Sequence, residues 1–89
     1  MLIKRRIQIR NSQGLHARPA SMFARIANKF ESDVTVKKDS ELVNGKSIMG
    51  LLTLAANQGC FVEIEVSGED ADAAIKALEE FLTNDKEEA

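Results

Sequence analysis

The chain has 89 residues, of which 44% are hydrophobic and 29% are charged, and its net charge is −2. This length supports one hydrophobic core, so we expect a single domain at residues 1–84 followed by a polar tail at 85–89. The acidic balance argues against nucleic-acid binding, which needs a basic face. Cys60 is the only cysteine, so no internal disulfide can form. Metal sites usually combine several cysteine and histidine ligands, and this chain has one of each, which argues against a metal site.

No segment has the length and apolar character of a membrane span, and the basic N-terminus lacks the continuous apolar run of a signal peptide. We therefore expect a cytoplasmic protein without membrane insertion. No cofactor-binding motif is found, so we expect no cofactor.

Residues 1–10 predict a half-buried strand, because isoleucines on one parity alternate with charged and amide side chains on the other. Arg5 interrupts the apolar parity, which indicates an edge or an end of the sheet. The following NSQG at residues 11–14 is typical of a turn.

From Ala17 onward the apolar spacing changes to three and four residues, which predicts an amphipathic helix. Its apolar stripe consists of Ala20, Phe23, Ala24, Ala27 and Phe30. Pro19 is tolerated only in the first turn of a helix, so the helix should begin near His16–Arg18.

Three short elements follow the first helix. Val34 and Val36 alternate with Thr35 and Lys37, which predicts a second strand. The KKDS motif at residues 37–40 predicts a turn, and Glu41–Asn44 is expected to form a short third strand. The segment Ile48–Ala56 is then expected to form a short helix.

The remainder of the chain predicts a fourth strand and a third helix. Val62, Ile64 and Val66 alternate with glutamates, and SGEDAD at residues 67–72 provides a turn and acidic residues for a helix N-terminus. The stripe of the third helix consists of Ala71, Ala74, Ile75, Leu78 and Leu82. One apolar face on each strand predicts an α+β fold, in which helices cover one face of a four-stranded antiparallel sheet.

His16 is the only histidine in the chain, and it lies at the predicted start of the first helix. The free N–H groups and the positive dipole end of a helix N-terminus bind anions and disfavour a cationic ring, which favours a neutral, nucleophilic imidazole. A phosphoryl group on the ring could be held by the backbone N–H groups of Ala17 and Arg18 and by the Arg18 guanidinium. A lone histidine is often only a polar surface residue, and these features alone leave phosphate and carboxylate both open.

The motif NGKS at residues 44–47 does not complete a nucleotide-binding loop, which requires a glycine where Ser40 stands. Ser47 instead suits the N-cap of the following helix. That helix carries more apolar side chains than one face can bury, which predicts an exposed docking patch. Burial of the helix on two sides is the alternative.

Two motifs resemble those of one known family. GLHARPA at residues 14–20 resembles the active-site signature of HPr, the histidine-containing phosphocarrier family of the phosphoenolpyruvate-dependent phosphotransferase system, and residues 44–56 resemble its second signature. The resemblance implies an open-faced β-sandwich with strand order 1-4-2-3 and three helices on one face. It also implies that enzyme I phosphorylates Nδ1 of His16, that Arg18 stabilises the phosphate, and that enzyme IIA-type partners receive the group. Such a protein is a carrier and not a stand-alone catalyst.

The resemblance also implies roles for surface residues. Ser47 matches a serine that an HPr kinase/phosphorylase modifies in many bacteria. Ile48, Met49 and Leu52 match residues that meet enzyme I and enzyme IIA domains around the histidine. Ser21 and Arg25 lie one and two turns into the first helix, on the face that should continue the His16 surface, so we expect them to take part in docking. Because docking accounts for the apolar patch, we expect a monomer.

Other functions remain open. A sugar-transport role and a role in the nitrogen-related branch (NPr) differ only in their partners. A regulatory binding module controlled by phosphorylation of Ser47, like the Crh relatives that lack the active histidine, is a different class of function. A small α+β domain without phosphoryl chemistry would leave the GLHARPA cluster unexplained.

Overall fold

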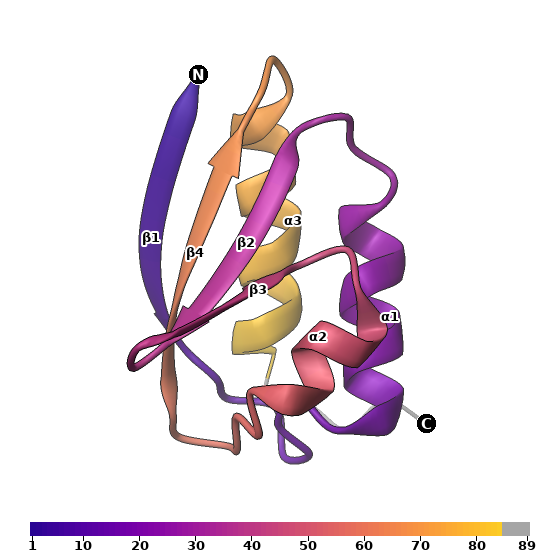
Figure 1. The fold of residues 1–89 in the computed structure, drawn as a ribbon, viewed down its shortest axis with the longest axis vertical. Helices are drawn as coiled ribbons and strands as arrows, with labels where there is room; N and C mark the ends of the chain where they lie inside the picture. The colour runs from indigo at the N-terminus through magenta and orange to yellow at the C-terminus, as the bar shows by residue number, and fades with distance from the viewer. Residues whose placement is uncertain (85–89) are drawn as a thin grey trace.

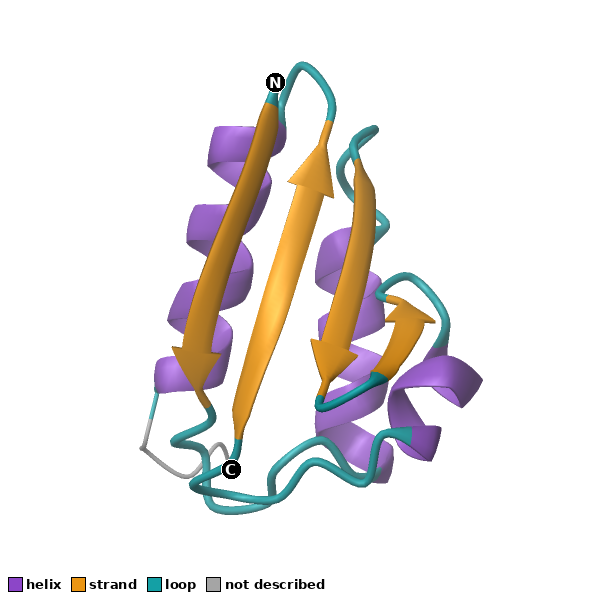
Figure 2. Ribbon diagram, turned by 60° about the vertical axis from the view of Figure 1, so that its left-hand side comes forward, coloured by secondary structure: helices purple, strands orange, loops and turns teal. Residues whose placement is uncertain are grey.

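The computed structural model describes residues 1–84, in which three helices cover one face of a four-stranded antiparallel sheet (Figure 1). The elements are β1 (Leu2–Gln8), α1 (Ala17–Ala27), β2 (Asp33–Lys38), β3 (Glu41–Asn44), α2 (Ile48–Thr53), β4 (Phe61–Ser67) and α3 (Ala71–Thr83). The strand order is β1-β4-β2-β3, and Figure 2 shows the opposite face of the sheet free of helices. The predicted fold class and strand order are confirmed, and the expected polar tail at 85–89 lies outside the described residues.

The core lies between the sheet and the helices, where the apolar faces predicted for the strands pack against the apolar stripes of the helices. Alternate side chains of β4 and β2 are buried, as is the whole stripe predicted for α3. Phe23 of α1 is fully buried, whereas Phe30 lies beyond the end of α1 and is half-buried against the core. Removing a buried ring such as that of Phe23 costs about 3–5 kcal/mol.

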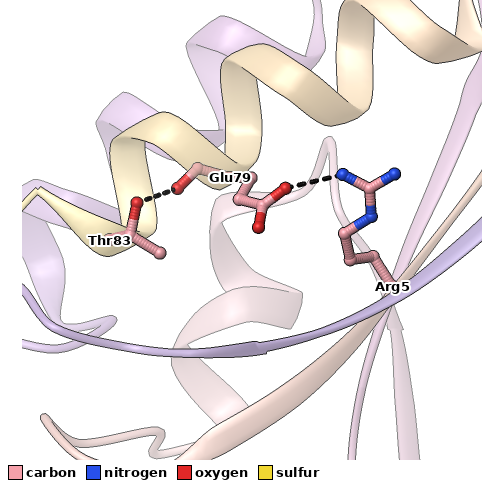
Figure 3. A network of polar contacts seen from close by, with 3 residues as sticks. All are labelled: Arg5, Glu79 and Thr83. Carbon is pink, nitrogen blue, oxygen red and sulfur yellow. Dashed lines mark hydrogen bonds and ion pairs between the residues drawn. The ribbon is translucent and has the colours of Figure 1, made fainter.

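Arg5 interrupts the apolar parity of β1 because this strand is at the edge of the sheet. Its guanidinium donates a hydrogen bond of 2.8 Å to Glu79 of α3, and the Glu79 carbonyl accepts one of 2.8 Å from Thr83 (Figure 3). At an edge the charged end reaches both solvent and a partner, so the expected edge position is confirmed.

The second helix is shorter than predicted: α2 ends at Thr53, whereas the sequence indicated a helix to Ala56. The chain leaves the helical path because Ala55 adopts a positive φ of 51°. The Lys38 ammonium stabilises this end by donating to the carbonyls of Leu54 at 3.3 Å and Ala55 at 3.2 Å. A cation on the last carbonyls also complements the helix dipole.

The turn expected at residues 37–40 is also shorter in the structure. Lys37 and Lys38 continue β2 and pair with Leu42 and Glu41 of β3. Pairing across the hairpin therefore extends the strand and confines the turn to residues 39 and 40.

Asp70 connects the start of α3 to the loop between α1 and β2. It occupies the N-cap position but makes no cap bond; its carboxylate accepts hydrogen bonds from the backbone N–H groups of Glu31 at 2.9 Å and Ser32 at 3.0 Å, and from the Ser32 hydroxyl. The Ser32 hydroxyl is the main cause that holds the pKa of Asp70 below its ordinary value of 3.8, and the Glu31 N–H adds to it. Of the acidic residues expected at this helix start, Asp72 alone lies in its first turn.

Candidate functional site

His16 is the N-cap residue of α1, as the position of Pro19 indicated. Its backbone is extended, with φ −94° and ψ −164°, and its carbonyl accepts the first helical hydrogen bond from Ala20 at 2.7 Å. The side chain is exposed and makes no cap bond. The imidazole therefore lies at the open end of an 11-residue helix without serving that helix as a cap.

The first turn of α1 has the properties of an anion site. The N–H groups of Ala17 and Arg18 precede the first intrahelical bond, and both residues are exposed. No acidic residue lies in this turn, and within residues 1–84 no carboxylate forms an ion pair with Arg18. The first turn of α1 thus offers free amides and, within the described residues, a guanidinium without an ion pair, groups that can hold an anion.

Two loops that are distant in sequence hold His16 in place. The loop after β1 and the loop before β4 lie side by side at one end of the sheet (Figure 1). The N–H of the buried Leu15 donates to the Ala56 carbonyl at 2.7 Å, Ile9 donates to Cys60 at 2.9 Å, and Gly59 donates to Ile9 at 2.8 Å. Backbone bonds therefore fix the residue before His16 to the segment that follows α2.

The structure brings one residue to the ring that the sequence analysis missed. Asn57, in the loop before β4, places its Oδ1 at 2.9 Å from His16 Nε2. Because an amide oxygen only accepts hydrogen bonds, this contact is a hydrogen bond in the tautomer that carries its proton on Nε2. The NQG motif around Asn57 indicates a turn, and nothing in the local sequence connects a turn residue to a histidine 41 positions earlier.

The N-terminus of α2 is capped as predicted, since the Ser47 hydroxyl accepts a hydrogen bond of 3.0 Å from the Gly50 N–H. The exposure expected on this helix is also confirmed. The side chains of Ile48, Met49 and Leu52 are 43%, 74% and 38% exposed. We call these three residues the α2 patch.

The docking residues expected on α1 differ in exposure. Arg25 is exposed and Ser21 is half-buried. At the C-terminal end of α1, the Asn28 side chain donates to the Lys46 carbonyl at 3.1 Å. Ser47 therefore lies toward the end of α1 opposite to His16.

Neither membrane nor metal features are found in residues 1–84. None of these helices has the length and apolar character needed to cross a bilayer. Over the same part of the chain, no three histidine, cysteine, aspartate or glutamate side chains gather as a metal site would require.

Comparison with known proteins agrees with the geometry. The family model of the PTS HPr component phosphorylation site matches residues 3–84. The chain is 44% identical over 81 residues to the phosphocarrier protein HPr of Neisseria meningitidis, an alignment that covers 91% of each chain. It is 41% identical over 81 residues to the HPr-like protein Crh of Bacillus subtilis, covering 91% of this chain and 95% of Crh.

Solved structures give the same result. The crystal structure of HPr from Bacillus anthracis matches with a TM-score of 0.89 and 40% identity, covering 91% of this chain and 96% of that one. HPr from Thermoanaerobacter tengcongensis matches with a TM-score of 0.86 and 42% identity, covering 96% and 99%. With the family model spanning nearly every described residue, the chain belongs to the HPr family, the phosphocarrier proteins of the phosphotransferase system.

Proposed function

We propose that this protein accepts a phosphoryl group on Nδ1 of His16 and passes it to a second protein. In the forward step the Nδ1 lone pair forms a P–N bond while the donor's own bond to phosphorus breaks, and that electron pair stays with the donor. Transfer onward is the same step with the roles exchanged. Imidazole suits both directions, because it is a good nucleophile and a good leaving group.

The observation that carries this proposal is the exposed ring at the N-terminus of α1, two residues before Arg18, which makes no ion pair within residues 1–84. A dianion on Nδ1 would meet the N–H groups of Ala17 and Arg18 and the positive end of the helix dipole, an interaction typically worth about 0.3–1 kcal/mol. The Arg18 guanidinium would add a charge-assisted hydrogen bond. These groups stabilise the phosphoryl group without holding it covalently, as a relay requires.

The donor and the acceptor are proposed from family membership: enzyme I supplies the phosphoryl group and enzyme IIA-type proteins receive it, in the cytoplasm. The α2 patch supports a docking role because it exposes three large apolar side chains on one short helix. Arg25 and Ser21 would extend this surface, and Arg25 would attract acidic partners.

Ser47 is a proposed regulatory site for an HPr kinase/phosphorylase. A helix of 11 residues spans about 16 Å at a rise of 1.5 Å per residue, and Ser47 lies toward the end of α1 that is far from His16. A phosphate on Ser47 would therefore act by adding negative charge beside the α2 patch, which opposes docking of an acidic partner. The similarity to Crh supports a second candidate function, a regulatory binding module controlled at Ser47.

One experiment separates the two functions. The protein is incubated with phosphoenolpyruvate and a broad-specificity enzyme I, and its intact mass is measured. A carrier gains one acid-labile phosphoryl group, which His16→Ala abolishes and Arg18→Ala slows. An unchanged mass with several enzyme I homologues, combined with an acid-stable adduct from ATP and an HPr kinase that Ser47→Ala removes, would favour the regulatory module.

The expected monomer is a separate proposal. Structures of an HPr dimer from Thermoanaerobacter tengcongensis and of dimeric Crh match this chain. Size-exclusion chromatography with light scattering determines the oligomeric state, and a stable dimer would contradict the proposal.

A further inference from the structure

We propose that Asn57 is a positioning residue for His16: its amide oxygen keeps the proton on Nε2 and thereby leaves Nδ1 as the nitrogen that reacts. This inference rests on the proposed phosphoryl-carrier function and specifies how one ring nitrogen is selected. The contact that carries it is the 2.9 Å separation between His16 Nε2 and Asn57 Oδ1.

The neutral imidazole has one N–H and one lone pair, and the partner of one nitrogen decides the state of the other. Asn57 Oδ1 can only accept, so the contact favours the tautomer with the proton on Nε2. No hydrogen bond is made to Nδ1 within residues 1–84, and the side chain does not cap α1. The remaining lone pair is therefore free for a phosphoryl donor.

The same contact becomes stronger when the phosphoryl group is transferred. The P–N bond forms at Nδ1, the Nε2 proton stays, and the ring acquires the positive charge of a phosphorylated imidazolium. The hydrogen bond from Nε2 to Asn57 Oδ1 is then charge-assisted, and such bonds are shorter and stronger than neutral ones. An interaction that strengthens along the reaction lowers its barrier, whereas one of constant strength does not.

Asn57 can act in this way because its backbone is fixed relative to the ring. Its carbonyl accepts a hydrogen bond of 3.0 Å from the Cys60 N–H, and the preceding Ala56 is buried and bonded to Leu15. Gly14 approaches this segment so closely that an added β-carbon would lie 2.9 Å from the Asn57 α-carbon. The two side chains thus extend from neighbouring positions of one backbone junction, although both are exposed.

The first test is spectroscopic and needs no phosphoryl donor. Because His16 is the only histidine in the chain, long-range proton–nitrogen NMR correlations report a single imidazole. In the neutral ring of the wild type we expect a protonated Nε2 and an unprotonated Nδ1. Asn57→Leu should shift the population toward the other tautomer, whereas Asn57→Asp, which retains an acceptor oxygen, should restore it.

The second test is the rate of phosphorylation by enzyme I. Asn57→Leu should slow it by about 2- to 10-fold, the factor that one net hydrogen bond represents. Gln58→Leu is the matched control: it removes an amide from the same turn, together with a 3.1 Å bond to the Arg10 carbonyl, and should leave the rate unchanged. Urea unfolding checks that the variants fold.

Two results would overturn the inference. One is a wild-type neutral ring with its proton on Nδ1. The other is an Asn57→Leu protein that matches the wild type in both tautomer and rate. A wild type that shows the expected tautomer but is never phosphorylated would count against the proposed function, because the NMR comparison stands without any donor.

Discussion

Gly14 and Ala56 are in such close contact that a β-carbon on Gly14 would lie 2.6 Å from the Ala56 carbonyl oxygen. The next residue, Leu15, donates to that same oxygen at 2.7 Å. The glycine immediately before the site therefore allows the loop that carries His16 to meet the loop that carries Asn57. Its φ of +66° adds a second reason for glycine, because other residues rarely adopt that conformation.

Gly14→Ala should destabilise the protein and slow phosphorylation of His16. The added methyl group overlaps the Ala56 carbonyl and separates the two loops, and the left-handed backbone adds strain of about 1–3 kcal/mol. Gly59→Ala is a control at a φ of +91° with no atom within 4 Å of the added carbon, so it bears the strain without the overlap. Urea unfolding and the phosphorylation rate are the measurements, and equal effects of both variants would contradict the importance of the contact.

Ser47→Ala should lower the free energy of unfolding by about 0.5–2 kcal/mol, the usual cost of losing an N-cap. The Ser47 hydroxyl accepts a hydrogen bond from the Gly50 N–H at the start of α2. A helix of only 6 residues makes few intrahelical hydrogen bonds, so this cap is a large part of what holds it. Ser47→Asp keeps an acceptor and places a negative charge at the helix N-terminus, so its stability should stay near that of the wild type. Urea unfolding tests both, with Ser40→Ala in the exposed β2–β3 turn as control.

Ser47→Asp also tests the docking proposal. If charge beside the α2 patch opposes docking, this variant should accept the phosphoryl group from enzyme I more slowly while remaining folded. Ser47→Ala should not show that defect. A rate for Ser47→Asp equal to that of the wild type would contradict regulation by charge at this position.

Protonation of Asp70 should lower the free energy of unfolding in acid. Its pKa is held below the ordinary value of 3.8, first by the Ser32 hydroxyl and then by the Glu31 N–H. A lowered folded-state pKa contributes stability that is fully present above the unfolded-state pKa and is lost as pH falls through the folded-state pKa.

The measurement is urea unfolding of the wild type and Asp70→Asn from about pH 6 to about pH 2.5. The wild type should be the more stable protein at the upper end, and the difference should shrink toward the lower end. Asp33→Asn, an exposed carboxylate in the neighbouring strand β2, serves as control. A difference for Asp70→Asn that does not change with pH would show that its ionised form is not what stabilises the loop.

The helices and strands could be predicted because the apolar spacing that indicates each of them lies within a few neighbouring residues. The stripe from Ala71 to Leu82 has helical spacing, and every member of it is buried in α3. Pro19 placed the start of α1 to within a residue or two, because its missing N–H is tolerated only in the first turn. His16 could be singled out because it lies only three residues before Pro19, so the proline that marks the helix start also places the histidine at that start.

The boundaries and contacts that the sequence did not predict depend on distant residues. The helix expected to reach Ala56 ends early, where the side chain of Lys38 on β2 holds the last carbonyls. Aspartate is a residue type that often caps helices, but the carboxylate of Asp70 accepts its hydrogen bonds from a loop that includes Ser32, 38 residues earlier. No local periodicity contains such information.

The sequence by itself determined the alternation of strands and helices, their apolar faces, and an imidazole at a helix N-terminus, because propensity and periodicity act over a few residues. The strand order came from family resemblance. Only the tertiary structure decided which polar group meets the ring. Asn57 reaches His16 because the sheet brings the ends of β1 and β4 together, and backbone bonds then join the loops beyond those ends.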